Sequence, residues 1–479
     1  MLTTPRPRFG ARAPLAAGLS AVMFAALLVT TAPAQAAPTP GADGIGDSYF
    51  PLDGNGGIDV VRYRIHDRYR FPTKKLSGRT VLTVEATQDL SSFNLDFLLP
   101  VRRVKVDGVR AAHDKPNRHE VVISPTRPIS SGDTFKVSVS YAGRPAPISY
   151  LGEKNWLANR HEVVTMNQPH MATWWFPSND HPSDKALMDI SITVPRGKQV
   201  FANGDRVSIK RSGGLATHHW RADEPMSTYL AVFAAGDFRV DSGVRDGLPW
   251  RAIVSKQLSR GAQQDNLALM RQTPRVVAGL ESDLGDYPFS QVGGLVTGLN
   301  VYFALENQTL PTYPVTGRGY TWLVVHELAH QWFGDSVGLR RWKDIWLNEG
   351  AATFMEVRWE ETHGGQLGSD WLRGGYEKRG ADHSFWDLKI GDPGPDHIFA
   401  GPVYTRGGMT FQALRNRIGE TDFWTLLQTW VVENRNGLGT REAFETMAED
   451  VSGENLHQFF RVWLDLGRKP ADTAANGLG

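Results

Sequence analysis

Two histidines four positions apart, His326 and His330, constrain this chain more than any other feature, with Glu327 between them. Residues i and i+4 lie on the same side of a helix, so both imidazoles can hold one metal ion. Glu349 follows nineteen positions after His330, which leaves room for a turn, a connector and a second helix. Two imidazoles, one carboxylate and a position left for water are typical of a catalytic zinc site. The fold must therefore bring two helices together at this point, and Glu327 is the expected general base.

Both segments have the apolar periodicity of buried helices. The first ends at Gly334-Asp335, and its apolar members are Tyr320, Leu323, Val324, Leu328 and Trp332. The second is expected from near Lys343 to His363, with Glu349, Ala352, Thr353 and Glu356 on one face. Glu356 is thus a candidate acceptor for an imidazole N–H of a metal ligand, which would orient the ring. The alternative for Glu356 is an exposed carboxylate without such a role.

Composition limits the chemistry and the partners. A chain of 479 residues is long enough for two or three domains with sizeable cores. A net charge of +1 gives no reason to expect nucleic acid or an anionic membrane as a partner. There is no cysteine, which excludes disulfides, a thiol nucleophile and a zinc site built from thiolates.

The N-terminus is typical of a secretory signal peptide. Arg6, Arg8 and Arg12 precede an apolar stretch over residues 13–29, and small residues suited to a signal peptidase follow at 32–37. We expect residues 1–36 to be removed by the general secretion route of a bacterium. The mature protein is then secreted, with no stable membrane association. An uncleaved membrane anchor is the alternative.

The rest of the sequence indicates an α+β protein of several domains. A flexible lead over residues 37–46 precedes a β-rich domain, expected at 47–242, and a mainly helical domain, expected at 243–468. Residues 469–479 are expected to be a disordered tail. Alternating apolar and polar residues predict strands, with residues 80–84, 135–139, 190–194 and 229–233 as the examples.

A short segment upstream of the first histidine bears on which bond is cut. It contains Ala304, Leu305, Glu306 and Asn307. A carboxylate fixed near the metal can bind the protonated amino terminus of a peptide and place the first peptide bond over the metal. Together with the His-Glu-x-x-His helix and residues 346–350 (Trp-Leu-Asn-Glu-Gly), this segment resembles the aminopeptidase N family of zinc aminopeptidases. That family also includes the leukotriene epoxide hydrolases.

The resemblance covers nearly all of the chain after the signal peptide and has one local departure. The family's segment is usually Gly-x-Met-Glu-Asn, whereas this chain has Phe303 in place of the glycine and Leu305 in place of the methionine. The resemblance implies a saddle-like β domain, a thermolysin-like catalytic domain, and one zinc ion held by His326, His330 and Glu349. It implies contacts to the substrate from Ala304, Glu306 and Asn307, with Glu306 on the α-amine.

Two further roles follow from the same resemblance. Gln168, which precedes Trp174 to Pro182 in the β domain, matches the residue that helps to anchor the amine. Tyr404 matches the catalytic tyrosine, whose phenol donates to the oxyanion that forms during the reaction. The implied activity is removal of N-terminal residues from peptides with a free amino terminus, by a protein that we expect to be a monomer.

The sequence leaves several alternatives for the substrate and the activity open. Many family members carry a further helical domain that caps the cleft. This chain ends about seventy-five residues after Tyr404, so we expect the short form and a more open site. A thermolysin-like endopeptidase shares the zinc signature but has no need of Glu306. An epoxide hydrolase, alone or with a second activity on peptides, and a non-enzymatic binding protein also stay open.

Overall fold

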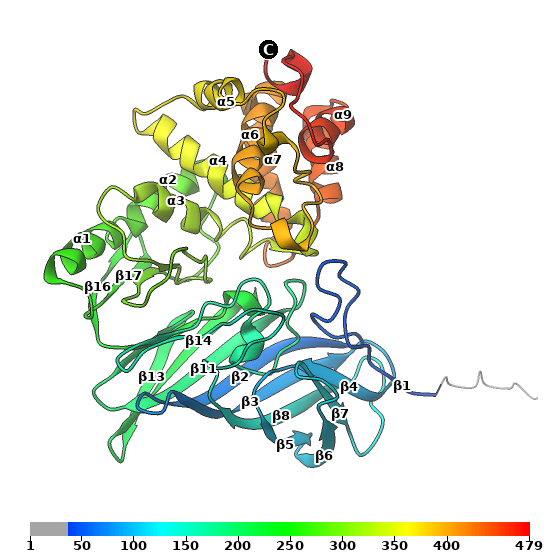
Figure 1. The fold of residues 1–479 in the computed structure, drawn as a ribbon, viewed down its shortest axis with the longest axis vertical. Coiled ribbons are helices and arrows are strands. Elements are labelled where there is room, and N and C mark those ends of the chain that lie inside the picture. Colours follow the sequence, from blue (N-terminus) through cyan, green and yellow to red (C-terminus); the bar gives the residue numbers. More distant parts are fainter. Residues whose placement is uncertain (1–36) are drawn as a thin grey trace, which may run out of the picture. The chain divides into compact units, whose positions relative to one another are not determined.

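A computed structural model describes residues 37–479 (Figure 1), and residues 38–479 form one compact unit. The predicted signal peptide, residues 1–36, lies outside the described residues. Between residues 37 and 479, no helix is both long and apolar enough to cross a membrane.

The first part of the chain is dominated by one 11-stranded sheet with the order β1-β4-β7-β6-β5-β8-β3-β2-β11-β14-β13. Its neighbours are antiparallel except for two parallel pairs, β1 with β4 and β2 with β11. The strands are β1 (Thr39–Pro40), β2 (Ile58–Arg70), β3 (Lys75–Ala86), β4 (Leu90–Asp96), β5 (Val101–Val106), β6 (Val109–Asp114), β7 (Glu120–Ser124), β8 (Thr134–Gly143), β11 (Lys185–Pro195), β13 (Asp205–Ser212) and β14 (Leu215–Ser227).

Alternation explains why these segments form strands with one buried face. In β2, the buried residues Tyr63, Ile65 and Tyr69 alternate with more exposed ones, as a period of two requires. Outward-facing Arg62 and Arg221 both bind Asp189 of β11, which joins three strands through one carboxylate. Three of the four predicted example strands lie inside β3, β8 and β11.

A smaller four-stranded sheet has the order β12-β15-β10-β9. Its strands are β12 (Gln199–Ala202), β15 (Phe233–Gly236), β10 (Val163–Val164) and β9 (Leu157–Ala158). The strand predicted over 229–233 was wrong, because Thr228–Leu230 form a 3-10 turn and β15 begins only at Phe233. The carbonyls there accept side-chain amides instead of pairing in a sheet, Leu230 from Asn307 and Ala231 from Asn167.

The second part of the chain combines a small sheet with helices. The sheet has the order β16-β17-β18-β19, with β16 (Phe238–Arg245), β17 (Leu248–Ser255), β18 (Val292–Val296) and β19 (Thr312–Tyr313). The helices are α1 (Arg260–Met270), α2 (Thr273–Leu284), α3 (Thr321–Ala329), α4 (Trp346–Thr362), α5 (Gly368–Glu377), α6 (Gly401–Ile418), α7 (Glu420–Glu433), α8 (Arg441–Ser452) and α9 (His457–Phe460). A two-stranded ladder joins β20 (Gly338–Leu339) to β21 (Leu438–Gly439).

The predicted α+β fold, with a β-rich domain followed by a helical peptidase-like domain, is confirmed (Figure 1). Since β16 pairs with β17 of the second part, we propose to place the boundary before Phe238 rather than after residue 242.

The two ends of the described chain are more ordered than the sequence predicted. In the expected lead, Thr39 and Pro40 pair with β4. In the expected tail, the carbonyl of Asn476 accepts the indole N–H of Trp463 at 3.1 Å, and Leu478 is buried. The prediction of a disordered tail was wrong because small and polar residues here satisfy buried groups of the helical core.

Candidate metal centre and substrate cavity

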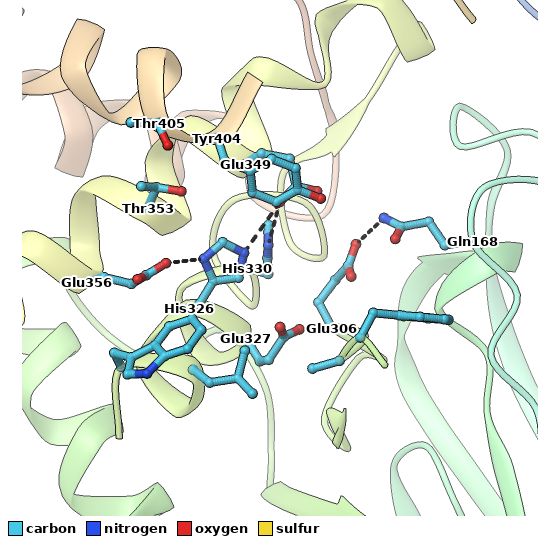
Figure 2. A pocket seen from close by; sticks show the side chains of 14 residues that line it. Gln168, Glu306, His326, Glu327, His330, Glu349, Thr353, Glu356, Tyr404 and Thr405 are labelled. Carbon is cyan, nitrogen blue, oxygen red and sulfur yellow. Dashed lines mark hydrogen bonds and ion pairs between the residues drawn. The ribbon is translucent and has the colours of Figure 1, made fainter. Parts of the chain in front are cut away.

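The three predicted metal ligands meet between α3 and α4. Nε2 of His326 and Nε2 of His330 each lie 3.4 Å from the same oxygen, Oε2 of Glu349 (Figure 2). Ligand atoms around a tetrahedral zinc are themselves about 3.4 Å apart when each bond is about 2.1 Å. All three residues are buried. The donor set and its spacing therefore fit a zinc ion.

The outer nitrogens of both rings already have acceptors. Nδ1 of His326 lies 2.6 Å from Oε1 of Glu356, which is on α4. Nδ1 of His330 lies 3.1 Å from the carbonyl oxygen of Phe333. An acceptor at Nδ1 places the ring proton there and leaves the Nε2 lone pair free for a metal. Glu356 is thus in the position that the helical spacing predicted.

The charges of this cluster reinforce one another. Burial opposes ionisation of Glu349, but the neighbouring charge of His330 and hydrogen bonds from both histidines lower its pKa to about 2. Burial also opposes protonation of His326, yet its hydrogen bonds to Glu349 and Glu356 raise its pKa well above the usual value. Glu349 is thus held as the carboxylate that a divalent cation requires.

Glu327 and Tyr404 face the same cavity from different helices. Glu327 is 4% exposed, and burial raises its pKa to about 8. The ring of Tyr404 stacks on His326 with a centroid separation of 6.0 Å. Tyr404 lies in the first turn of α6, which is fixed by the buried Arg406, whose guanidinium donates to four backbone carbonyls. A proton acceptor and a hydroxyl donor therefore stand on rigid helices beside the metal ligands.

Glu306 and Gln168 form a direct contact across the two parts of the chain. Nε2 of Gln168 donates to Oε1 of Glu306 at 2.8 Å (Figure 2). Both residues line the same cavity as the three metal ligands. Glu306 is 3% exposed, and burial raises its pKa although the nearby His330 opposes this shift.

The segment that carries Glu306 is held at several points. Leu305 exchanges two backbone hydrogen bonds with Thr312, at 2.9 and 2.8 Å. The Glu306 carbonyl accepts from Nε2 of Gln331, the residue after His330, at 3.2 Å. Asn307 is a correction to the prediction, because it is fully buried, donates to the Leu230 carbonyl and does not line the cavity. Its amide fixes the segment instead of facing a substrate.

The cavity has a volume of about 370 Å³. Besides the predicted residues, which include Ala304, it is lined by Phe303, which the family comparison had placed near the substrate cleft. Four further lining side chains were given no substrate contact by sequence reasoning: Trp322, Leu323, Thr353 and Thr405. Thr353 could have been found, since it shares a helical face with Glu349 and Glu356. Phe303 and Trp322 are 54% and 42% exposed, and no local pattern sets their direction.

Comparisons with known proteins agree with this geometry. The model of the peptidase family M1 domain matches residues 294–463, and the model of the peptidase M1 N-terminal domain matches residues 61–230. The first match contains the metal ligands, Glu306 and Tyr404, and the second contains Gln168. The chain belongs to peptidase family M1. As a member of this family of zinc metallopeptidases, it is expected to hold a single catalytic zinc, which the donor set of His326, His330 and Glu349 fits.

Similar M1 proteins come from all three domains of life. The probable aminopeptidase 1 of Sulfurisphaera tokodaii is 27% identical over 63% of this chain and 38% of its own length. Aminopeptidase N of Lactococcus lactis subsp. cremoris is 24% identical over 84% of this chain and 50% of its own length, and aminopeptidase M1-A of Oryza sativa is 27% identical over 65% of this chain. The chain thus spans half or less of the length of these relatives.

A solved structure matches over almost its whole length. The M1 zinc metallopeptidase from Deinococcus radiodurans has a TM-score of 0.79 and 28% identity to this chain. The match covers 89% of this chain and 98% of the Deinococcus chain. The match therefore extends through both parts of the fold.

Proposed function

We propose that this protein is a secreted zinc aminopeptidase that removes the N-terminal residue from peptides. The observation that carries the proposal is the pair formed by Glu306 and Gln168 in the wall of the metal cavity. A buried carboxylate that binds an ammonium group fixes the distance between the free amino terminus and the metal. Only the first peptide bond can then be attacked.

The residues around the cavity have different roles in the proposed hydrolysis. His326, His330 and Glu349 would hold a zinc ion, which would supply a bound water of lowered pKa and a Lewis acid for the scissile carbonyl. Glu327 accepts the proton of the attacking water and returns it to the leaving amine. Tyr404 donates a hydrogen bond to the carbonyl oxygen as negative charge develops there.

The substrate contacts complete the assignment. Glu306 and Gln168 hold the α-amine, so that the first peptide bond is oriented before the reaction begins. Ala304 lies in the cavity wall on the same segment and is proposed to contact the peptide backbone. One structure of a mutant M1 metallopeptidase from Deinococcus radiodurans is described as bound to a Tyr-Ser-Ala substrate, which supports short peptides as the substrate class.

The endopeptidase and epoxide hydrolase hypotheses predict different reaction products. A defined decapeptide, incubated with the zinc-loaded protein and followed by mass spectrometry, should shorten one residue at a time from its amino terminus. Internal fragments as the first products would indicate an endopeptidase instead. Turnover of an epoxide with no peptide cleavage would indicate an epoxide hydrolase.

Secretion is proposed from the sequence of residues 1–36 alone. Expression of the full chain in a bacterial host should place the mature protein outside the cytoplasm, with a new amino terminus near residue 37. An intact first residue on the recovered protein would contradict cleavage. We also propose a monomer, which light scattering of the purified protein tests.

A further inference from the structure

A second cluster of potential metal ligands lies in the large sheet, far from the cavity residues in sequence. Asp96 ends β4 and Glu120 begins β7, and these two residues are direct partners across the antiparallel pair. Asp96 is 0% exposed and Glu120 is 1% exposed. Like charges directly opposite each other destabilise a sheet, and burial makes this worse. The pair therefore needs a cation or a proton between its carboxylates.

His119 supplies a third ligand at this point. Its Nδ1 lies 3.1 Å from Oε1 of Glu120 and 3.6 Å from Oδ1 of Asp96. Atoms of all three side chains lie within 4.8 Å of one another, as they do in the catalytic triad. These separations lie on either side of the spacing of about 3.4 Å expected around a tetrahedral ion. One imidazole and two carboxylates form a suitable donor set for a divalent transition metal.

Unpartnered polar atoms point to a missing ligand. Among the described residues, Oε2 of Glu120 and Oδ1 of Asn55 are buried and have no hydrogen-bond partner. Nδ2 of Asn55, a residue that is 0% exposed, lies 3.0 Å from Oδ1 of Asp96. The two ends of an amide group have nearly the same shape, so a rotation by 180° would bring the Asn55 oxygen into the cluster. Oε2 of Glu120 and the Asn55 oxygen would then both be available to a cation.

Among the described residues, the nearby Lys115 and His170 form no hydrogen bond or ion pair with Asp96 or Glu120. The ammonium of Lys115 donates to the carbonyl of Phe97, and burial lowers its pKa to about 8. Nδ1 of His170 lies 2.6 Å from Oδ2 of Asp53, so this imidazole is already hydrogen-bonded. Oδ2 of Asp96 already accepts two backbone N–H groups.

We propose that Asp96, His119 and Glu120 bind a structural divalent transition-metal ion, zinc or manganese, with the amide oxygen of Asn55 as the fourth ligand. The ion would fix the N-terminal strap, defined here as residues 41–57. This strap also contacts the helical part of the chain, where Asp47 accepts the N–H of Trp342 at 3.4 Å and the Tyr49 hydroxyl accepts the N–H of Gly394 at 2.8 Å. The ion would therefore stabilise the packing between the two parts without taking part in catalysis.

Metal content tests the proposal independently of activity. The mature protein is stripped of metal with a chelator, reloaded with zinc or manganese, and separated from free metal. It should then hold two metal ions per chain, measured by inductively coupled plasma mass spectrometry. His119→Ala should hold one and keep its peptidase activity. The isosteric variant Glu120→Gln should bind the second ion at least 10-fold more weakly. His113→Ala, on the adjacent strand β6, should still hold two.

Three results would overturn the site. One ion in the wild type, removed by Glu349→Ala, would show that Asp96 and Glu120 share a proton instead. Two ions in both His119→Ala and Glu120→Gln would place the second ion elsewhere. If the second site bound calcium but neither zinc nor manganese, a transition metal would be excluded there. If the protein had no peptidase activity, the expected number of metal ions per chain in each variant would stay the same.

Discussion

Both histidine ligands of the candidate zinc site depend on a group that is not itself a ligand. Glu356 holds Nδ1 of His326 at 2.6 Å, and the Phe333 carbonyl does the same for His330. These contacts set the ring orientation, and a carboxylate also increases the basicity of the ring. The helical spacing from Glu349 to Glu356 predicted this arrangement, because both residues need only share one face of α4.

Replacement of Glu356 tests this contact. Glu356→Gln should weaken zinc binding by about 10- to 100-fold and lower activity at limiting zinc, since an amide holds the imidazole less firmly. Excess zinc should restore much of the activity. Glu360→Gln, exposed one turn further along α4, is the matched control. Unchanged zinc affinity, measured by competition with a chromophoric chelator, would show that Glu356 does not support the ligand.

Replacement of Glu306 tests the amine anchor. Glu306→Gln keeps the side-chain size but removes the charge that attracts the ammonium, so kcat/KM should fall by about 10- to 100-fold. Zinc content should stay the same. The measurement is steady-state hydrolysis of an aminoacyl anilide. Normal kinetics combined with a lower melting temperature would make Glu306 a structural carboxylate.

The crossing of two helices sets the distance between the metal ligand Glu349 and Tyr404. Gly350 of α4 and Gly407 of α6 meet there, and a Cβ atom on Gly350 would lie 2.9 Å from the backbone of Gly407. That distance is too short for a real carbon–carbon contact, so only glycine permits this approach. The position of Tyr404 therefore depends on a residue next to the zinc ligand on the other helix.

Gly350→Ala should force the helices apart. We expect a loss of about 1–3 kcal/mol of unfolding free energy and a fall in kcat, because overpacking displaces Tyr404. The control is Gly374→Ala in α5, where nothing lies within 4 Å of the new methyl group. That change should stabilise the protein by about 0.5–1 kcal/mol. Equal effects of the two changes in chemical denaturation would contradict the close crossing.

At the scale of the whole molecule, the cavity requires both parts of the chain. Gln168 comes from the β-rich part and Glu306 from the other, 138 positions away. Lys185, at the start of β11, joins the same parts because its ammonium donates to the carbonyls of Asp335, Ser336 and Gly437 at 2.9, 2.7 and 3.3 Å. Correct packing of the parts is thus a condition for the proposed amine site.

Lys185→Met should loosen this packing. Three carbonyls lose their donor, so we expect a loss of about 1–3 kcal/mol of stability. KM should rise as Gln168 moves relative to Glu306, whereas zinc content should not change. Lys210→Met, an exposed residue on β13, should have neither effect. Wild-type KM in the Lys185 variant would mean that the packing does not depend on this ammonium.

The sequence predicted those features that depend on local spacing. Alternation gave β3, β8 and β11, and the interval of four placed His326 of α3 and its C-cap residue His330 on the same side. Residues 229–233 were misassigned because their carbonyls are satisfied by side chains distant in sequence, such as Asn307. The contact of Gln168 with Glu306 came only from the family resemblance, since no local pattern brings them together. Trp322 was assigned no substrate contact because long-range packing, not spacing, turns it into the cavity.

The most direct test of the central claim compares aminoacyl anilides with free and with acetylated amines. The zinc-loaded protein should prefer the free amine by about 100-fold or more, because acetylation leaves the buried Glu306 without its charged partner. A zinc chelator should abolish the activity, and Glu306→Gln should reduce the preference. Hydrolysis of both substrates at the same rate by the wild type would contradict an anchored amino terminus.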